Sequence, residues 1–402
     1  MIAIDKALRI VIRRASEVGA ERVPIESSVG RVLAQNIVAD SNLPPFDRSQ
    51  MDGYAVKASD TASPPVTLRI VGESAAGKGW HQKLKKGEAV RIMTGAAVPQ
   101  GADAVQKLEL TSDAGFDAAN ERVTILDHVK PRTAIVKKGS EINSGTVVLR
   151  SGELITPNNI SSLAAFGYSK VLVSKRPRVG VLATGSEIVP IDKKPGRDQI
   201  RNSNSIMLDA LASAVGAQCE IFEPAGDDLR ELKLKIQNYA KGKDILIITG
   251  GVSVGKYDLT KTALIELGAE VFFEKLKLKP GKPAVFARLG KTLVFALPGN
   301  PVSAAVTFYL LVRTAILRMQ NASISQLKQG TAILAADAKA VMDRDTLLPA
   351  TLSTNADGKL IVTSLRSQGS SDLVGFARSD SLIYVKAGVN FKKGETVEIV
   401  YL

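Results

Sequence analysis

The glycine-rich segment Gly250-Gly-Val-Ser-Val-Gly255 has the composition of an anion-binding loop. Glycines let backbone N–H groups approach a bound anion closely, and a helix that starts after the loop adds roughly half a positive charge. Ser253 supplies a hydroxyl donor. The segment is neither a Walker A loop nor a dinucleotide-binding fingerprint, because the lysine and the glycine spacing are missing. A tight strand-to-helix turn would use the same glycines, so both interpretations stay open.

Lysines alternate with leucines in Lys275-Leu-Lys-Leu-Lys279, and Lys282 follows three residues later. Alternate side chains of a strand share one face, so Lys275, Lys277 and Lys279 would lie together. Three ammonium groups side by side repel one another unless an anion lies between them. An exposed edge strand that carries lysine as protection against aggregation would show the same pattern.

Four acidic residues follow expected strand ends: Glu187, Asp227, Asp228 and Asp258. Carboxylate oxygens together with a bound phosphate are the usual ligands of Mg²⁺. Helix capping is the alternative for each acid, and it is strongest for Asp227 and Asp228.

Two dense segments lie nearer the N-terminus. The first, Pro44 to Val56, presents Asp47 and Asp52 between prolines and a glycine. The second, Arg91 to Asp103, places Thr94 before Gly95. Taken alone, both segments predict only turns.

Strands and helices alternate from about Lys175 to Gln326, and these elements must position the candidate residues. Nearly continuous apolar runs such as Asp244 to Thr249 are typical of parallel strands buried on both faces. The pattern predicts a doubly wound α/β domain. Ligands bind such domains at the carboxyl ends of the strands. Three loops are expected there: Thr184 to Glu187, Thr249 to Gly255 and Leu297 to Pro301.

The rest of the chain has a different pattern of apolar and turn-forming residues. Short apolar runs broken by Gly, Pro, Asp and Ser predict a β-rich zone from about Pro44 to Gly139. From about Gly330 to Leu402 the β pattern returns, with a hairpin turn at Asn355-Ala-Asp-Gly358, which predicts a small barrel or sandwich. Apolar residues at helical spacing from Ile4 to Ala15 predict an amphipathic helix that packs on a core, with Gly19 as its stop signal.

The composition limits which ligands and metal sites are plausible. The 402 residues carry 53 Lys plus Arg against 40 Asp plus Glu, a net charge of +13, which favours the capture of anions. The basic residues are spread along the chain and aromatic residues make up only 5%, so nucleic acid is not a favoured ligand. The chain has one cysteine, Cys219, and two histidines, which makes a Cys/His zinc site implausible. A single cysteine allows no disulfide within the chain, which indicates a cytosolic protein. No apolar run approaches the ~20 residues of a membrane helix.

Together these segments resemble the molybdopterin molybdenumtransferase family. The motifs that carry the resemblance occur in the family's order: Pro44 to Val56, Ile92-Met-Thr-Gly95, Gly101-Ala-Asp-Ala104, Thr184-Gly-Ser-Glu187, Gly250 to Gly255 with Asp258, Lys279-Pro-Gly-Lys-Pro283 and Leu297-Pro-Gly-Asn-Pro301. The resemblance implies a multidomain α/β plus β fold of four domains. They are a doubly wound α/β molybdopterin-binding domain (1–22 and 175–326), a discontinuous connecting domain (23–43 and 140–174), a β-rich domain (44–139) and a C-terminal β-barrel (327–402).

The resemblance also implies a reaction. The family inserts molybdenum from molybdate into adenylylated molybdopterin, with Mg²⁺, and releases AMP together with the molybdenum cofactor. The catalytic residues it implies are Asp52, Thr94, Glu187, Asp228, Lys275 and Lys279. Those implied to hold the pterin, its phosphate or molybdate are Gly250, Gly251, Ser253, Gly255, Lys282, Pro298, Asn300, Pro301 and Ser370. Asp258 would help to place Mg²⁺.

The implied assembly is a cytoplasmic homodimer. Its cleft would combine the second domain of one subunit, with Asp52 and Thr94, and the third and fourth domains of the other. A molybdopterin adenylyltransferase and apo-molybdoenzymes are the expected protein partners, and no membrane is expected.

The sequence departs from the family pattern at Pro349, where an arginine is common, at Lys138-Gly-Ser-Glu141 and at Ser186. Arg344 or Arg366 could replace the missing guanidinium. These departures leave open a paralogue that prefers tungstate or has reduced activity, and a non-catalytic molybdopterin-binding scaffold is a further alternative. Because the segment from about Lys175 to Gln326 resembles domains that adenylylate molybdopterin, an adenylyltransferase is the remaining alternative. The last would not need the flanking domains.

Overall fold

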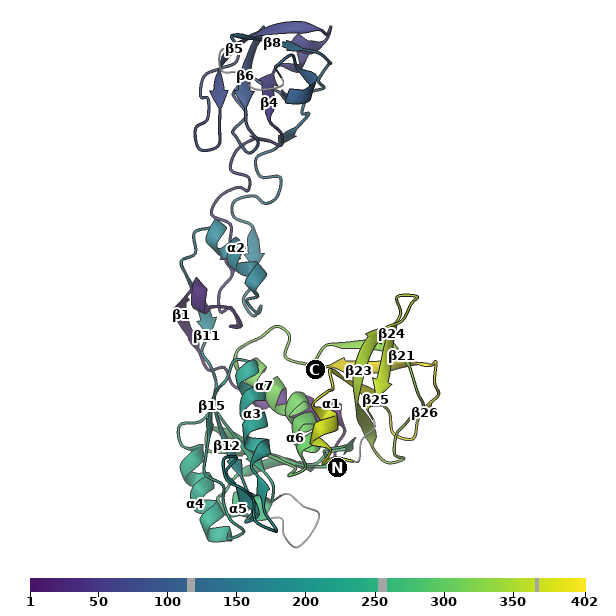
Figure 1. The fold of residues 1–402 in the computed structure, drawn as a ribbon. Coiled ribbons are helices and arrows are strands. Elements are labelled where there is room, and N and C mark those ends of the chain that lie inside the picture. The colour runs from purple at the N-terminus through teal and green to yellow at the C-terminus, as the bar shows by residue number, and fades with distance from the viewer. Residues whose placement is uncertain (114–119, 252–258, 366–368) are drawn as a thin grey trace. The chain divides into compact units, whose positions relative to one another are not determined.

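The computed structural model describes residues 1–113, 120–251, 259–365 and 369–402 (Figure 1). The chain forms two compact units. The first contains Met1–Gln35, Ser151–Ile160 and Ser169–Leu402, and the second contains Asn36–Arg150 and Ser161–Tyr168. The finer division into four domains stays a prediction.

A six-stranded sheet in the order β15-β12-β16-β20-β19-β17 forms the centre of the α/β part of the first unit. The strands are β12 (Arg178–Ala183), β15 (Gln218–Ile221), β16 (Ile245–Thr249), β17 (Glu270–Lys275), β19 (Pro283–Leu289) and β20 (Thr292–Leu297). The first four in this spatial order are parallel, and β19 runs antiparallel to both of its neighbours. The predicted doubly wound fold is therefore confirmed, with one antiparallel strand that the sequence analysis missed.

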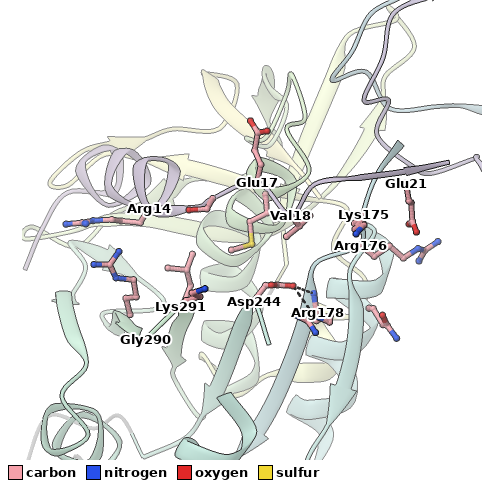
Figure 2. A pocket seen from close by; sticks show the side chains of 15 residues that line it. Arg14, Glu17, Val18, Glu21, Lys175, Arg176, Arg178, Asp244, Gly290 and Lys291 are labelled. Atoms are coloured by element: carbon pink, nitrogen blue, oxygen red, sulfur yellow. Dashed lines mark hydrogen bonds and ion pairs between the residues drawn. The ribbon is translucent and has the colours of Figure 1, made fainter. Parts of the chain in front are cut away.

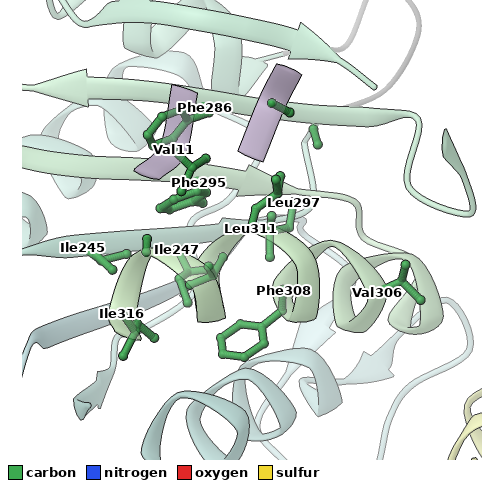
Figure 3. Packing of buried hydrophobic residues seen from close by; sticks show 14 of the residues in the cluster. Val11, Ile245, Ile247, Phe286, Phe295, Leu297, Val306, Phe308, Leu311 and Ile316 are labelled. Atoms are coloured by element: carbon green, nitrogen blue, oxygen red, sulfur yellow. The ribbon is translucent and has the colours of Figure 1, made fainter. Parts of the chain in front are cut away.

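Helices cover both faces of this sheet. They are α1 (Ile4–Arg14), α3 (Ser203–Ala214), α4 (Leu229–Ala240), α5 (Leu259–Glu266), and α6 (Pro301–Thr307), which continues through a π turn (Phe308–Val312) into α7 (Arg313–Met319). One apolar cluster joins α1, α3, α6 and α7 to Ile245, Ile247 and Phe295 (Figure 3). A second cluster joins α4 and α5 to the intervening residues Leu246 and Ile248. Alternate residues of each strand thus enter opposite cores, which explains the nearly continuous apolar runs.

Helix α1 belongs to the α/β core although its sequence lies far from the rest of that core. Ile4, Ala7 and Val11 are buried in the first cluster, as the helical spacing predicted. The helix ends at Arg14, before Gly19 is reached, so the predicted stop signal was wrong. Ala15 is already extended, and Gly19 (φ 83°) instead makes the turn before strand β1 (Ala20–Pro24).

Among the described residues, one helix, Pro301–Met319, is long and apolar enough to cross a membrane. The expectation that no apolar run approaches membrane length was therefore wrong for this segment. Val306, Phe308 and Leu311 from this helix are fully or almost fully buried in the first cluster. The helix is a core element of the α/β part, which explains its apolar composition.

The C-terminal strands close into a barrel. They are β21 (Gln329–Leu334), β23 (Asp345–Thr354), β24 (Leu360–Ser364), β25 (Ser381–Val385) and β27 (Thr396–Tyr401). Strand β23 pairs with both β24 and β25, which closes the circuit through β21 and β27. The hairpin at Asn355–Gly358 joins β23 to β24 as predicted, with Gly358 N–H donating to Asn355 O at 3.0 Å.

The second unit is built on a five-stranded sheet in the order β7-β4-β6-β5-β8. Its strands are β4 (Gly53–Val56), β5 (Val66–Ser74), β6 (Glu88–Ile92), β7 (Ala104–Lys107) and β8 (Arg122–Ile125). The predicted β-rich zone is confirmed.

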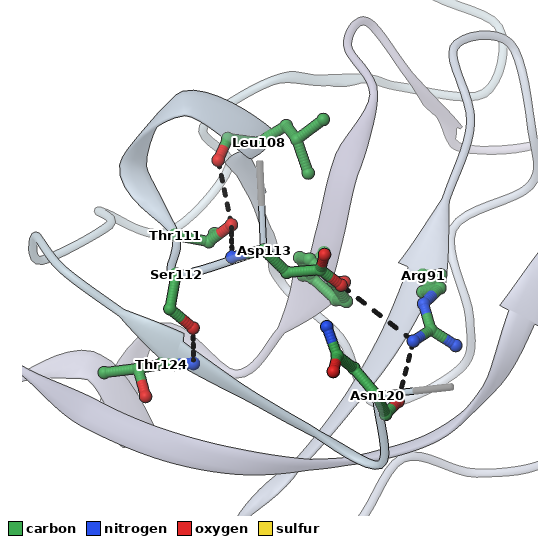
Figure 4. A network of polar contacts seen from close by, with 8 residues as sticks. Arg91, Leu108, Thr111, Ser112, Asp113, Asn120 and Thr124 are labelled. Atoms are coloured by element: carbon green, nitrogen blue, oxygen red, sulfur yellow. Dashed lines mark hydrogen bonds and ion pairs between the residues drawn. The ribbon is translucent and has the colours of Figure 1, made fainter. Parts of the chain in front are cut away.

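A buried polar network stabilises one end of this sheet (Figure 4). The Tyr54 hydroxyl donates to Asp113 Oδ2 at 2.6 Å, and Arg91 lies 3.9 Å from the same carboxylate. Arg91 also donates to Asn120 O at 2.7 Å. The network therefore anchors the chain on both sides of residues 114–119.

Candidate active site

A pocket of about 700 Å³ lies at the carboxyl ends of β12, β16 and β20. All three predicted loops contribute to its wall, with Thr184, Gly250 and Pro298 among the lining residues. This is the edge at which open α/β sheets bind ligands. The position follows from the parallel register, which places Ala183, Thr249 and Leu297 at one level.

Two helices begin at this pocket. Asn202 caps α3, accepting a hydrogen bond from Ser205 N–H at 3.2 Å, and Ser203 and Asn204 line the pocket beside it. Helix α6 begins at Pro301, another lining residue. Each helix N-terminus carries a partial positive charge and unpaired N–H groups. The pocket is therefore suited to an anionic group such as a phosphate.

The glycines of the predicted anion loop allow two loops to approach each other closely. Gly250 (φ 95°) and Gly251 (φ 63°) both adopt the left-handed region. A Cβ atom on Gly250 would lie 2.4 Å from the backbone oxygen of Thr184. A side chain at this position is therefore excluded by both conformation and space. Gly250 and Gly251 line the pocket, as predicted.

Asn204 connects the loops that follow β16 and β20. Its Nδ2 donates to Thr249 Oγ1 at 3.0 Å and to Gly299 O at 2.7 Å. Thr249 Oγ1 in turn donates to Pro298 O at 3.2 Å. These bonds fix the two loops relative to each other at the floor of the pocket.

Two buried polar atoms at this pocket have no hydrogen-bond partner among the described residues: Thr184 Oγ1 and Asn204 Oδ1. Both residues line the pocket, and Thr184 is 6% exposed. Buried polar atoms without partners are costly, by about 1–3 kcal/mol each. Both oxygens are therefore candidate acceptors for donor groups of a ligand in the pocket.

The acidic candidates have separate positions. Glu187 lines the pocket, and so does Asp227, whose Oδ2 accepts from the Ser186 hydroxyl at 2.7 Å. Asp228 instead caps α4 and accepts from Glu231 N–H at 2.8 Å. The structure therefore places Asp227, rather than the predicted Asp228, at the pocket wall. Asp258 lies outside the described residues, as do Ser253 and Gly255.

The lysine row has the predicted alternation. Lys275, Lys277 and Lys279 are exposed, whereas Leu276 and Leu278 are buried. Within the described parts of the chain, none of the three lysines forms an ion pair. Lys275 is paired across the sheet with Pro283, which lines the pocket. The row therefore begins beside the pocket rather than inside it.

Lys282 is half-buried and lies close enough to Asp343 to help lower the pKa of that carboxyl, after the larger effect of Arg344. It does not line the pocket.

The loop from Leu297 to Pro301 is hydrogen-bonded to the segment between β24 and β25 of the barrel. Pro298, Asn300 and Pro301 line the pocket as predicted, and Asn300 Nδ2 donates to the Ser370 hydroxyl at 2.8 Å. Ser370 O also accepts from Val302 N–H at 3.1 Å. Ser370 is thus occupied in holding the loop, while its neighbour Ser371 lines the pocket.

Asp52 and Thr94, which come from different motifs, meet in the second unit. Asp52 Oδ1 accepts from Thr94 N–H at 2.7 Å and from the Thr94 hydroxyl at 2.8 Å. The backbone bond first, and then the hydroxyl bond, hold the pKa of Asp52 below its ordinary value. Asp47, in contrast, is neutralised by Lys137 at 2.6 Å. Asp52 is therefore an ionised carboxylate that remains available to a ligand.

Sequence reasoning missed several residues of the pocket. Asn204 and Arg201 both line it. Arg201 belongs to a two-residue parallel pairing between β13 (Ile188–Val189) and β14 (Ile200–Arg201). The capping signal of Asn202 could have shown that a helix begins here at a strand end, but nothing in the sequence distinguishes Asn204 from an ordinary polar residue in a first helical turn.

The departures from the family pattern are also located. Pro349 is buried within β23 of the barrel, and its carbonyl accepts from Leu365 N–H at 2.9 Å. Arg344 pairs with Asp343 at 3.2 Å, so its guanidinium is already engaged. Arg366 lies outside the described residues.

Three family models match the chain in succession. They are described as "MoeA N-terminal region (domain I and II)" over residues 2–167, "Probable molybdopterin binding domain" over 180–318 and "MoeA C-terminal region (domain IV)" over 331–402. Residues 180–318, which contain the six-stranded sheet apart from the first residues of β12, thus belong to the molybdopterin-binding class of α/β domains.

Full-length relatives extend this assignment. The chain is 33% identical to a molybdopterin molybdenumtransferase of Bacillus subtilis, covering 100% of this chain and 94% of the relative. It is also 33% identical to one of Haemophilus influenzae, covering 99% and 98%. A crystal structure of the molybdopterin biosynthesis MoeA protein from Pyrococcus horikoshii matches with a TM-score of 0.81 at 32% identity, over 100% of this chain and 99% of that one. The chain belongs to the molybdopterin molybdenumtransferase (MoeA) family.

Proposed function

We propose that the pocket binds adenylylated molybdopterin and that molybdate enters beside it, so that the chain completes the molybdenum cofactor and releases AMP. The observation that carries this proposal is the convergence of two helix N-termini, from α3 and α6, on a pocket that also contains two unpartnered buried oxygens. The helix termini suit the phosphates, and Thr184 Oγ1 and Asn204 Oδ1 suit donor groups of the pterin.

The lysine row supplies charge for the oxyanion. Lys275 and Lys279 carry ammonium groups with no carboxylate partner in the described residues, and Lys275 lies opposite the pocket residue Pro283. A row of uncompensated cations raises the local concentration of a dianion such as molybdate. Lys282 extends this basic edge.

The acids of the pocket fit Mg²⁺. Glu187 and Asp227 both line it, and neither forms an ion pair in the described structure, so the pocket wall carries two carboxylates without a cationic partner there. Asp258, in the family's motif, would be a further ligand. When bound, Mg²⁺ would neutralise negative charge on the phosphoanhydride. Ser186 meanwhile fixes the orientation of the Asp227 carboxylate through its two hydrogen bonds.

We propose further that the working form is a cytoplasmic homodimer, in which Asp52 and Thr94 of the partner subunit complete each site. The support is the state of Asp52. Thr94 keeps its carboxylate ionised and fixes its orientation, and no cation in the described structure pairs with it, so the carboxylate is free to act on a ligand. A molybdopterin adenylyltransferase would deliver the substrate and apo-molybdoenzymes would receive the product.

The test is molybdate-dependent release of AMP from adenylylated molybdopterin with Mg²⁺. Two isosteric variants make it sharp: Asp227→Asn and Asp228→Asn. Asparagine is as good a helix cap as aspartate, so Asp228→Asn keeps the α4 cap and should keep turnover. Asp227→Asn removes a charge from the pocket and should lower turnover by about tenfold or more. Lys279→Ala should lower it as well.

Loss of activity in Asp228→Asn with none in Asp227→Asn would reverse the assignment of the two acids. Tight binding of the pterin without AMP release, with molybdate or tungstate, would instead indicate a scaffold. Release with tungstate alone would indicate the tungstate-preferring paralogue.

A further inference from the structure

A second pocket, of about 840 Å³, lies at the opposite edge of the six-stranded sheet (Figure 2). Arg178 at the start of β12, Asp244 just before β16 and Leu293 near the start of β20 line it. The same three strands reach the candidate active site at their other ends. The strands, five or six residues long, separate the two pockets by roughly 15–20 Å, so a ligand in one does not touch the other.

This amino-end pocket is strongly basic. Its cationic side chains are Arg14, Lys175, Arg176, Arg178, Arg288 and Lys291, and its acidic ones are Glu17, Glu21 and Asp244. The lining therefore carries a net charge of three positive. Figure 2 shows Arg14 and Arg176 on opposite sides, with Lys291 and Arg178 between them.

Half of these cations already have acidic partners. Arg178 pairs with Asp244 at 3.6 Å. Arg14 and Arg288 both pair with Glu270, at 3.2 and 2.5 Å.

The remaining three cations outnumber the one lining acid that has no ion pair in the described structure, Glu17. Lys175, Arg176 and Lys291 form no ion pair within the described part of the chain. Of the acids, Glu21 is already paired with Arg31 at 2.5 Å. Three cations around one hollow repel one another, and an anion bound between them would remove that repulsion.

The floor of the pocket is apolar. Val18, Leu293 and Met319 line it, and Leu293 and Met319 are almost fully buried. A volume of this size accommodates a small organic molecule rather than a bare inorganic ion. We propose that the amino-end pocket binds a small organic phosphate, whose phosphate groups contact Lys175, Arg176 and Lys291 and whose uncharged part covers the apolar floor. The arginine offers a planar fork for phosphate oxygens, and the two lysines act as point charges.

Because of where this pocket lies, a bound ligand would affect the connection between the α/β sheet and the β1–β11 pair. Its wall includes Ser16, Glu17 and Val18, which connect α1 to β1, and Lys175 and Arg176, which connect β11 (Lys170–Ser174) to β12. Both chain crossings between the α/β sheet and the β1–β11 pair therefore line one hollow. A bound phosphate would join these two crossings to Lys291, in the turn between β19 and β20, and stiffen the connection.

The experiment uses the full chain labelled with ¹³C at its methionine methyl groups, and ADP as the probe. The chain has only six methionines, so the resonance of Met319 can be assigned with Met319→Leu. ADP should shift the Met319 resonance, and adenosine, which lacks phosphate, should not. The Lys175→Gln/Lys291→Gln variant should bind ADP at this pocket about tenfold or more weakly.

The matched control is Lys83→Gln/Lys359→Gln, which removes two charges from exposed positions elsewhere. It should leave the Met319 titration unchanged, and both double variants should retain molybdate-dependent AMP release, which shows that they fold. The proposal is overturned if Met319 does not respond to millimolar ADP, or if both double variants weaken the response equally. Failure of AMP release in wild type would bear on the proposed function alone, because the Met319 readout does not depend on catalysis.

Discussion

Adjacent carboxylates in this chain have different surroundings and different tasks. Asp228 caps α4, whereas Asp227 lines the candidate active site beside Ser186. Both positions look alike in the sequence, because either aspartate can precede a helix. Only the path of the backbone decides which carboxylate reaches the pocket, and one residue of difference at a helix start rotates the side chain out of it.

Asn204 gives the sharpest prediction for a single residue. Asn204→Ala removes the bonds to Thr249 and Gly299 and the buried acceptor Oδ1, which has no partner in the described structure. We expect it to lower the free energy of unfolding by about 1–2 kcal/mol. AMP release should fall by about tenfold or more, because the loops after β16 and β20 lose their connection.

The control for Asn204 is Asn159→Ala in α2 (Pro157–Ala165). Asn159 also makes two side-chain hydrogen bonds, although as an acceptor: its Oδ1 accepts from the N–H and the hydroxyl of Thr156, and it lies away from the pocket. It should cost a similar stability in a denaturant titration and leave turnover intact. Equal loss of turnover in both variants would show that Asn204 acts through stability alone.

Cys219 should be unreactive over the ordinary pH range. Burial, and then the nearby Asp209 carboxylate, raise the pKa of its thiol to about 12. The thiolate is the reactive form, and in the unfolded chain it forms near pH ~8.5. Iodoacetamide at pH ~9 should therefore alkylate the folded protein far more slowly than the guanidinium-unfolded protein. Because the folded-state pKa is the higher one, the free energy of unfolding should also fall as pH rises above about 8.5. Equal alkylation rates in the two states would contradict this.

Among the strands, the sequence predicted best those that are buried on both faces, because such burial requires a continuous apolar run. Strands β12 and β16 are buried on both faces, so their apolar runs had one interpretation. Strand β19 was missed although most of its residues are apolar. It follows the lysine row directly, and no helix separates it from β20, so the expected strand-helix alternation breaks there.

The loop that follows β16 shows how tightly two elements can be coupled. Gly250→Ala would place a methyl group 2.4 Å from the Thr184 oxygen, in a backbone conformation with φ 95°. We expect a loss of about 3 kcal/mol or more in the free energy of unfolding, since steric conflict adds to the conformational strain. Substrate binding should weaken as well, because the loop must move away from Thr184.

Gly268→Ala separates these two effects. Gly268 also has a positive φ, 76°, but a Cβ atom added there would have no neighbouring atom within 4 Å. Its cost should be about 1 kcal/mol, from strain alone. Thermal or denaturant unfolding of the two variants measures the difference, and equal costs would show that the contact with Thr184 relaxes without penalty.

For the whole molecule, the sequence predicted the α/β part, the β-rich unit and the barrel, because each has its own hydrophobic periodicity. It did not predict the contact between Asp52 and Thr94: the resemblance implied only that both residues belong to the cleft, the two lie 42 positions apart, and neither motif alone indicates the contact. Pairings of this kind depend on sheet register between β4 and β6, which no local pattern encodes.

The proposed dimer makes a quantitative prediction. One subunit carrying Asp52→Asn and the other carrying Lys279→Ala would leave one of two shared sites intact. Heterodimers purified through two different tags should therefore recover about half of the wild-type rate of AMP release, although each variant homodimer should release AMP far more slowly than that. Heterodimers as inactive as the homodimers would show that Asp52 serves the site of its own subunit.

The α/β core combines parts of the chain that lie far apart in the sequence, and this affects folding during translation. Helix α1 packs against Phe295, Leu311 and Ile316, which the ribosome adds about 280 to 300 residues later. At roughly 5–20 residues per second, that interval lasts about 15–60 s. An isolated helix of 11 residues is marginal in water, so its apolar face has no stable partner during this time. The nascent chain thus carries an unsatisfied hydrophobic segment through most of its translation, and chaperones that bind such segments have their longest opportunity here.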